Sequence, residues 1–288
     1  MKKIENNTYE IIQNKTFDEE RALYGLKKSR VINCTFAGPA DGESAFKESR
    51  GIAVENCNFS LRYPFWHSDT FTITKCNMDE YTRAAIWYAE NGEIYKCNLN
   101  GIKALRECSN VLLDGCNVKS PEFGWRCKDV FLQNCNIVSE YFMFESKNLK
   151  FNSVKFDGKY SFQYVENAVI ENCDFTTKDA FWHSKNVTVI NSTLKGEYLG
   201  WYSEKLTLIN CLIIGTQPLC YCKKLKLINC RTENCDLAFE YSDVNAEITG
   251  GIVSVKNPKS GKITAESVGE IIMRDAEIPC RGKVIIKP

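Results

Sequence analysis

A cysteine-centred phrase recurs along most of this chain and constrains its fold more than any other feature. In each copy a turn-forming residue precedes a cysteine and an apolar residue follows two positions later, as in Asn56-Cys57-Asn58-Phe59. The cysteines of the phrase are Cys34, Cys57, Cys76, Cys97, Cys116, Cys135, Cys173, Cys211 and Cys230. Positions 116, 135, 154, 173, 192, 211 and 230 differ by 19 each, with Val154 and Ser192 in place of cysteine. A fixed period of this length is typical of a solenoid of stacked coils.

Each coil also carries a short alternating stretch before its cysteine, such as Val187-Thr188-Val189. This period of two indicates a strand with two inward side chains. Polar residues such as Asn186 and Asn191 bracket the strand, and asparagine tolerates the left-handed backbone that a sharp corner needs. Nineteen residues leave no room for a strand plus a full helix. The sequence therefore predicts an all-β, right-handed parallel β-helix of about 12 coils of 19 to 23 residues.

The repeat leaves no linker and predicts a single domain over residues 1–288. Residues 1–25 are expected to form an N-terminal cap or the first coil, and residues 26–254 the regular coils. Residues 255–288 break the rhythm, so they are expected to form irregular C-terminal coils and a cap that covers the exposed strand edges.

Charge and the N-terminus limit the partners and the compartment. Lys and Arg total 37 against 36 for Asp and Glu, a balance that predicts no nucleic-acid partner. The start of the chain lacks the apolar run of a signal peptide, and no stretch is long and apolar enough for a membrane span. We therefore expect a cytoplasmic protein without a membrane partner, whose 15 cysteines are reduced and serve mainly as small core residues.

The segment from Thr16 to Leu26, the phrase Phe65-Trp66-His67-Ser68 and the Asn-Cys coils together resemble an uncharacterised bacterial family, known only as a domain of unknown function. That family belongs to the pectin-lyase-like superfamily of single-stranded right-handed β-helices. The resemblance covers nearly the whole chain and implies the fold. It supplies no activity and no catalytic residues.

Three neighbouring columns of the repeat concentrate aromatic and ionisable side chains. All five tryptophans fall in one column, ten residues before the cysteine position. The next column reads His67, Tyr88, Glu107, Arg126, Glu145, Tyr164, His183, Tyr202 and Tyr221, which is too polar to be buried as a whole. The preceding column, which begins at Phe65, is apolar. If it points inward, the chain bends at the tryptophans and two columns face out; if the coil alternates strictly, tryptophan points inward instead. We favour the first arrangement.

Either arrangement gives one face of the rod an aromatic ladder edged with ionisable groups. Single exposed aromatic residues need no explanation, but a continuous exposed row of them indicates an interaction site. Such a surface suits the flat faces of sugar rings or a protein partner. The candidate binding residues are Trp66, His67, Trp87, Tyr88, Arg106, Trp125, Arg126, Tyr164, Trp182, His183, Trp201 and Tyr202. The function favoured by the sequence is a non-catalytic β-helix whose aromatic face binds carbohydrate or protein. The alternative is a polysaccharide-active glycosidase or lyase.

For that alternative, the available catalytic candidates are Glu107 and Glu145 with Arg126 between them. Two coils separate the carboxylates by ~9.6 Å, near the upper limit for inverting glycosidases. The cation between them opposes the role, because it favours ionised carboxylates whereas a general acid must hold its proton. A Glu-Arg-Glu ion ladder is therefore the simpler interpretation.

The sequence predicts neither a metal site nor a cofactor. His67 and His183 lie six coils apart and cannot share a metal. Cys220, Cys222, Cys230 and Cys235 lack the paired spacing of zinc ribbons. The outward strand positions carry one acid in nine, too few for the 6 to 8 oxygen ligands of calcium.

Overall fold

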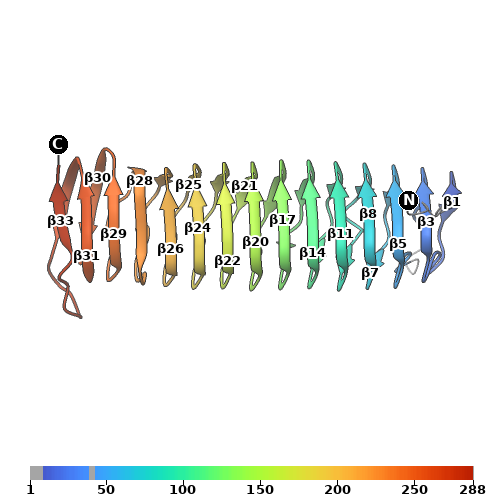
Figure 1. Cartoon of the computed structure of the whole chain (residues 1–288), viewed down its shortest axis with the longest axis horizontal. Helices are drawn as coiled ribbons and strands as arrows, with labels where there is room; N and C mark the ends of the chain where they lie inside the picture. Colours follow the sequence, from blue (N-terminus) through green and yellow to red (C-terminus); the bar gives the residue numbers. More distant parts are fainter. Residues whose placement is uncertain (1–8, 39–42, 288) are drawn as a thin grey trace, which may run out of the picture.

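The computed structural model describes residues 9–38 and 43–287 and shows a rod of stacked parallel strands (Figure 1). The strands of its long sheet run side by side from β1 at one end to β33 at the other. They are β1 (Glu10–Gln13), β3 (Lys27–Ile32), β5 (Arg50–Glu55), β8 (Asp69–Thr74), β11 (Glu90–Tyr95), β14 (Ser109–Asp114), β17 (Lys128–Gln133), β20 (Lys147–Asn152), β22 (Glu166–Glu171), β24 (Lys185–Ile190), β26 (Glu204–Ile209), β28 (Leu225–Glu233), β29 (Asp243–Ile248), β31 (Ser260–Ala265) and β33 (Lys283–Ile286).

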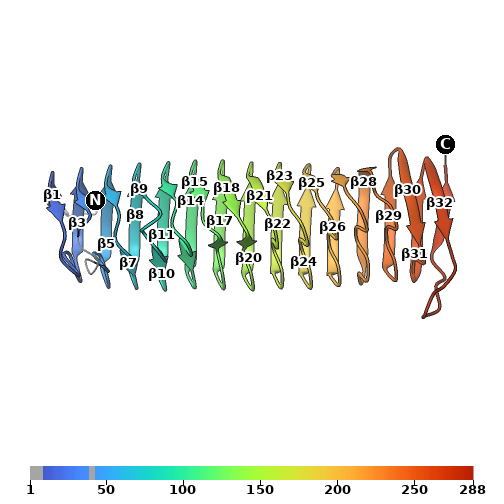
Figure 2. The ribbon, with the colours of Figure 1, turned by 180° about the vertical axis from the view of Figure 1, so that it is seen from behind.

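Shorter strands close each coil on the other side of the rod (Figure 2). One series stacks along the second face: β2 (Thr16–Phe17), β4 (Thr35–Phe36), β6 (Asn58–Phe59), β9 (Asn77–Met78), β12 (Asn98–Leu99), β15 (Asn117–Lys119), β18 (Asn136–Ser139), β21 (Lys155–Gly158), β23 (Asp174–Thr176), β25 (Thr193–Lys195) and β27 (Leu212–Ile214). The third face holds only short pieces: β7 (Phe65–Trp66), β10 (Ile86–Trp87) and β13 (Leu105–Arg106), then β16 (Glu122–Phe123) and β19 (Tyr141–Phe142). Near the C-terminal end β30 (Gly251–Lys256) pairs with β32 (Ser267–Ile272).

The predicted parallel β-helix is confirmed, and the right-handed sense of coiling stays a prediction. Fifteen strands of the long sheet joined by successive parallel pairings make about fourteen turns, two more than expected. The additional turns lie at the ends, where β1 pairs with β3 and β31 pairs with β33. The coil of β1 carries Asn14-Lys15 where later coils carry Asn-Cys, and the coils of β31 and β33 also lack that phrase.

The register explains the 19-residue period. Val187 of β24 pairs with Leu206 of β26, so equivalent residues of successive coils lie on top of one another. Inward positions form stacks, such as the rings of Phe36 and Phe59, whose centroids lie 4.8 Å apart at 4°. Asn186 and Asn191, the residues that bracket β24, adopt φ of 54° and 49°, which confirms the predicted left-handed corners.

The cysteine column forms part of this core. All fifteen cysteines are free thiols, and only Cys280 is partly exposed. Within the stack the backbone N–H of Cys57 donates to the sulfur of Cys76 at 3.4 Å, and the N–H of Cys76 donates to that of Cys97 at 3.3 Å. The thiols therefore fill the corner and accept hydrogen bonds that the turning backbone would otherwise leave unmade.

Candidate functional site

The predicted aromatic surface lies on one corner of the rod, which we call the aromatic corner: the tryptophan column and the column that follows it. Phe65 and the other apolar residues of its column point inward, with Phe65 and Phe162 at 0% exposure. The five tryptophans are half-buried and point outward. The next column turns the corner in the left-handed region, with φ of 55° at His67 and 59° at Tyr202. The first of the two arrangements expected from the sequence is therefore confirmed.

The rings of the aromatic corner stack on one another along the rod. Trp66 and Trp87 lie 5.7 Å apart at 15°, and Trp182 and Trp201 lie 5.6 Å apart at 5°. In the outer column His67 stacks on Tyr88, and His183 lies between Tyr164 and Tyr202 at 5.1 and 5.0 Å. Ring faces inside these stacks are covered, so the surface presents mainly ring edges and hydroxyl groups. Flat stacking of sugars on successive rings, which the sequence suggested, is open only at the ends of each stack.

A charged segment separates the two aromatic stacks. Trp125 lies there with the guanidinium of Arg106 5.5 Å from its ring. Arg106 pairs with Glu107 at 3.2 Å, and Arg126 pairs with Glu145 at 2.8 Å. The hydrogen bond to Glu145 raises the pKa of Arg126, and the hydrogen bond to Glu107 raises the pKa of Tyr88. Each carboxylate is thus held by an arginine, but Glu107 pairs with Arg106 and not with Arg126, so a continuous Glu107-Arg126-Glu145 ladder is not formed.

The other candidates stay apart. His67 and His183 belong to different stacks and do not meet. Cys220, Cys222, Cys230 and Cys235 are buried thiols of the core. Across residues 9–38 and 43–287, no three His, Cys, Asp or Glu side chains gather in a way that could hold a metal ion. The same part of the chain contains no helix that could span a membrane.

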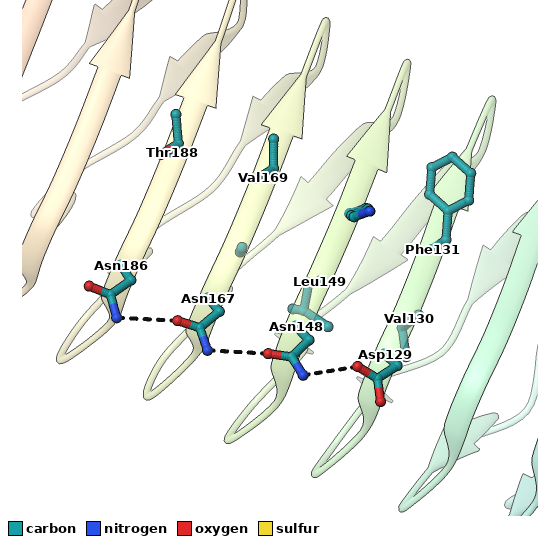
Figure 3. Close-up of a pocket in the computed structure, with 11 residues that line it drawn as sticks. Asp129, Val130, Phe131, Asn148, Leu149, Asn167, Val169, Asn186 and Thr188 are labelled. Atoms are coloured by element: carbon teal, nitrogen blue, oxygen red, sulfur yellow. Dashed lines mark hydrogen bonds between the residues drawn. The ribbon is translucent and has the colours of Figure 1, made fainter.

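Sequence reasoning missed a groove on the long sheet, which we call the asparagine groove. One wall is a ladder of side chains on β17, β20, β22 and β24: Asp129, Asn148, Asn167 and Asn186 (Figure 3). Each amide Nδ2 donates to the oxygen of the preceding side chain, at 2.9, 3.2 and 3.2 Å. The opposite wall is formed by Phe131, Lys150, Val169 and Thr188, and the cavity between them measures about 470 Å³.

The groove continues toward the N-terminal end of the rod. A second cavity of about 380 Å³ shares Asp129 and Phe131 with the first and extends past Asn110 to Asn91. Here too the amides are linked, because Asn110 donates to Asn91 at 2.7 Å and Asn91 donates to Asp69 at 2.8 Å.

Left-handed backbone at the ladder positions makes the groove. Asp129 and Asn148 have φ of 55° and 56°, which lifts their side chains out of the sheet as a wall beside the flat strand. The sequence did hold a signal for it, since positions 91, 110, 129, 148, 167 and 186 carry Asn or Asp at a strict spacing of 19. From the sequence alone, that column indicates only the boundaries of the strands.

A family model described as "Protein of unknown function (DUF3737)" matches residues 10–286. No curated protein matches the chain. Among solved structures, the A-module of mannuronan C-5 epimerase AlgE4 from Azotobacter vinelandii is 10% identical, with a TM-score of 0.36 and coverage of 96% of this chain and 90% of that one.

Two further structures are similar to the same extent. The surface adhesin PfbA of Streptococcus pneumoniae is 9% identical, with a TM-score of 0.36 and coverage of 93% and 81%. A mutant tailspike protein of E. coli bacteriophage HK620, solved with a pentasaccharide, is 9% identical, with a TM-score of 0.34 and coverage of 90% and 62%. At these identities the likeness concerns the course of the chain alone.

Proposed function

Since the chain belongs to this family of proteins of unknown function, we propose its function from its own geometry: it binds an extended glycan along the asparagine groove and does not cleave it. The hydrogen-bonded ladder of Asp129, Asn148, Asn167 and Asn186 beside a partly apolar wall is the observation that carries the proposal.

The ladder offers regularly spaced polar groups. An amide carries two N–H donors and an oxygen with two acceptor sites, so one ladder bond at each end leaves a donor and an acceptor free. Stacked strands repeat every ~4.8 Å, and therefore the free groups recur at that interval along the rod. A polymer of hexoses presents hydroxyl groups at a comparable repeat.

The opposite wall suits the apolar faces of the same ligand. Phe131 and Val169 provide carbon surface, and Val169 is 41% exposed. Lys150 and Thr188 add polar contacts at the same edge. Sugar rings combine C–H faces with hydroxyl edges, so a groove with one amide wall and one mixed wall fits a glycan better than a purely apolar ligand.

The aromatic corner belongs to the proposal as a second contact surface for carbohydrate or for a protein. Tyr88, Tyr164 and Tyr202 are 39%, 48% and 45% exposed and present their hydroxyl groups along one edge of the rod. Exposed tyrosines in a line are also typical anchors of protein interfaces, which keeps a protein partner as the rival ligand for this surface.

Two features favour binding without cleavage. The main cavity contains a single carboxylate, Asp129, which accepts a hydrogen bond from Asn148. The adjoining cavity adds Glu93, which accepts one from the hydroxyl of Tyr95 at 3.0 Å. Hydrolysis of a glycosidic bond uses a free acid and a free base placed across the bond, and these carboxylates are instead engaged with neighbours.

The test places an arginine in the groove. Val169→Arg fills the cavity from an exposed position and should therefore spare the fold. Thr207→Arg adds the same charge two coils further along the same outward column, outside the cavity. Electrophoresis in gels that contain soluble polysaccharides should show retardation of the wild type and of Thr207→Arg but not of Val169→Arg.

The proposal would be refuted if no glycan retarded the wild type and Thr207→Arg. It would also be refuted if Val169→Arg and Thr207→Arg were retarded equally. Reducing ends are measured in the same samples. Their release by the wild type, and its loss in Glu107→Gln or Asp129→Asn, would replace binding by the polysaccharide-active alternative.

A further inference from the structure

A separate cavity, distinct from both parts of the asparagine groove, lies on the third face of the rod. The aromatic corner stands between it and the groove. The cavity measures about 210 Å³ and is lined by Tyr63, Arg83, Trp87, Lys103 and Arg106, together with Ala84 and Ile102. The rings of Tyr63 and Trp87 form two of its walls, with centroids 5.7 Å apart at 47°. We call it the tyrosine–tryptophan pocket.

Three cations surround this pocket. Lys103 and Arg106 both approach Glu122, at 3.5 and 3.9 Å, and Arg106 also pairs with Glu107. Among the described residues the guanidinium of Arg83 has no hydrogen-bond or ion-pair partner. Three positive side chains therefore face two carboxylates, and one of the three is free to bind an anion.

The indole of Trp87 provides an independent observation. Its Nε1 is buried and has no acceptor, as is also true of Trp66 and Trp125, although buried N–H groups are almost always paired. In the C-terminal half of the rod the same column is satisfied: Trp182 donates to the carbonyl of Tyr198 and Trp201 to that of Gln217, both at 2.8 Å. The fold thus supplies an acceptor to this column in the C-terminal half, whereas the indoles of the N-terminal coils, with Trp87 beside the pocket among them, have none.

Size and walls define the class of ligand. The volume is below the roughly 300 to 1,000 Å³ typical of sites for drug-sized molecules, so one small ring fits. Aromatic walls suit the C–H faces of a sugar ring, and the cations suit a charged substituent. We propose that the tyrosine–tryptophan pocket binds a single hexose ring that carries a carboxylate or a phosphate, with Arg83 as the main partner of the anion.

This site is separate from the asparagine groove and does not rest on the function proposed for it. The two sources of the anion are compared by calorimetry with sodium glucuronate, glucose 6-phosphate, glucose and inorganic phosphate as probes. One of the two anionic sugars should bind and glucose should not. The tighter of the two identifies the substituent.

Arg83→Gln should weaken binding of that sugar by about tenfold or more, because it removes a charge-assisted hydrogen bond from an exposed side chain. The matched control is Arg274→Gln, which removes the same charge from an exposed position near the C-terminal end of the rod. Trp87→Phe should also weaken binding, whereas Trp201→Phe, in which a paired indole is removed, should not. Val169→Arg should leave this binding unchanged and so separates the pocket from the groove.

Failure of both anionic sugars to bind at millimolar concentration would overturn the proposal. Equal effects of Arg83→Gln and Arg274→Gln would do the same, because they would show that the anionic sugar is attracted only by the overall positive charge and not by Arg83 in the pocket. If inorganic phosphate bound as tightly as glucose 6-phosphate, the aromatic walls would contribute nothing to affinity, and the proposed hexose site would be wrong.

Discussion

The tetrapeptide Phe-Trp-His-Ser occurs twice in the rod, at residues 65–68 and 181–184, and folds differently in the two places. The side chains take similar positions, since both phenylalanines are buried and both histidines turn the corner with φ of 55° and 54°. The backbone differs at the first residue. Phe65 belongs to strand β7, whereas Phe181 has φ of 61°.

The hydrogen bonds show what this difference means. The N–H of Phe65 donates forward to the carbonyl of Ala85 in the next coil, at 3.0 Å. The N–H of Phe181 donates backward to Ser161 in the preceding coil, at 2.9 Å. Each peptide group must match the direction of the coils above and below it, because an opposed neighbour would leave a donor unpaired. Identical residues therefore take the conformation that their neighbours impose.

The direction in which the backbone N–H of this column donates changes between the coil of Leu105 and the coil of Gly124. Gly124 has φ of 78° and donates backward to Leu105 at 2.8 Å, whereas Ile86 still donates forward to Ala104. At this switch the N–H of Ala104 has no carbonyl above it and donates instead to the hydroxyl of Ser120 at 3.1 Å. Gly124 and the hydroxyl of Ser120 thus join two halves of the rod. In the N-terminal half the N–H of this column donates to the next coil, and in the C-terminal half it donates to the preceding coil. We call this property the peptide direction.

The largest expected effect tests whether packing is independent of peptide direction. Phe65→Ala and Phe181→Ala each empty a fully buried site, so each should lower the free energy of unfolding by about 3–5 kcal/mol. Denaturant titration would measure both, with the half-buried Phe144→Ala as a milder control. A large loss in only one of the two buried variants would show that peptide direction also changes the core.

The second test concerns the switch itself. Gly124→Ala forces a side chain into the left-handed region and against Met143, so it should cost about 1–3 kcal/mol. Gly115→Ala is the control, because Gly115 also has positive φ, at 65°, but its added Cβ would meet only Lys96, at 3.4 Å. Equal costs would mean that Gly124 matters for its φ alone and not for the joint between the halves.

The serines of the two tetrapeptides give a smaller contrast. The hydroxyl of Ser68 donates to the carbonyl of Phe46 at 2.9 Å, whereas the buried hydroxyl of Ser184 has no partner. Ser68→Ala should cost about 1 kcal/mol, and Ser184→Ala should be neutral or stabilising, because it removes an unsatisfied polar group. Thermal unfolding of the two variants would check this. Equal costs would mean that the two hydroxyl groups are equivalent, and a larger cost for Ser184→Ala would contradict the absence of a partner for that hydroxyl.

Comparison of the two phrases also shows what sequence could predict. The strand of Val187 and the corners at Asn186 and Asn191 follow from local periodicity, and the structure has them where expected. Which column faces inward follows from the polarity of the residues after Trp66. These features depend on side chains that act in the same way in every coil.

Peptide direction could not be predicted, because Phe65 and Phe181 stand in identical phrases and only their stacking partners differ. The missing acceptor at Trp87 could not be predicted either, because Trp201 stands in the same column and has one. The asparagine groove was missed for another reason. Asp129 and Asn148 look like strand boundaries in the sequence, but their left-handed backbone makes their side chains one wall of the groove. That wall forms only when successive coils are stacked.

The smallest expected effect is a pH dependence of opposite sign in the two halves. In the N-terminal half, the hydrogen bond from Asn91 lowers the pKa of Asp69. In the C-terminal half, burial raises the pKa of Asp179. Ionised Asp69 therefore stabilises the fold, and ionised Asp179 destabilises it.

The sign of each effect follows from the order of folded and unfolded pKa values. For Asp69 the stabilisation is complete above the unfolded pKa of about 3.9 and is lost as pH falls through the lower folded pKa. Asp69→Asn should therefore be less stable than the wild type at neutral pH, and the difference should shrink only in strong acid. For Asp179 the penalty is complete above the raised folded pKa and disappears as pH falls toward about 3.9.

Asp179→Asn should accordingly be more stable than the wild type at neutral pH, and this advantage should fade at a higher pH than the Asp69 effect does. Unfolding free energies of the wild type and the two variants, measured from neutral to acid pH, would give both curves. Asp174→Asn, at an exposed carboxylate in the same coil as Asp179, controls for the loss of a charge. If both variants changed stability in the same direction, the contrast between a hydrogen-bonded carboxylate in one half and a desolvated one in the other would be wrong.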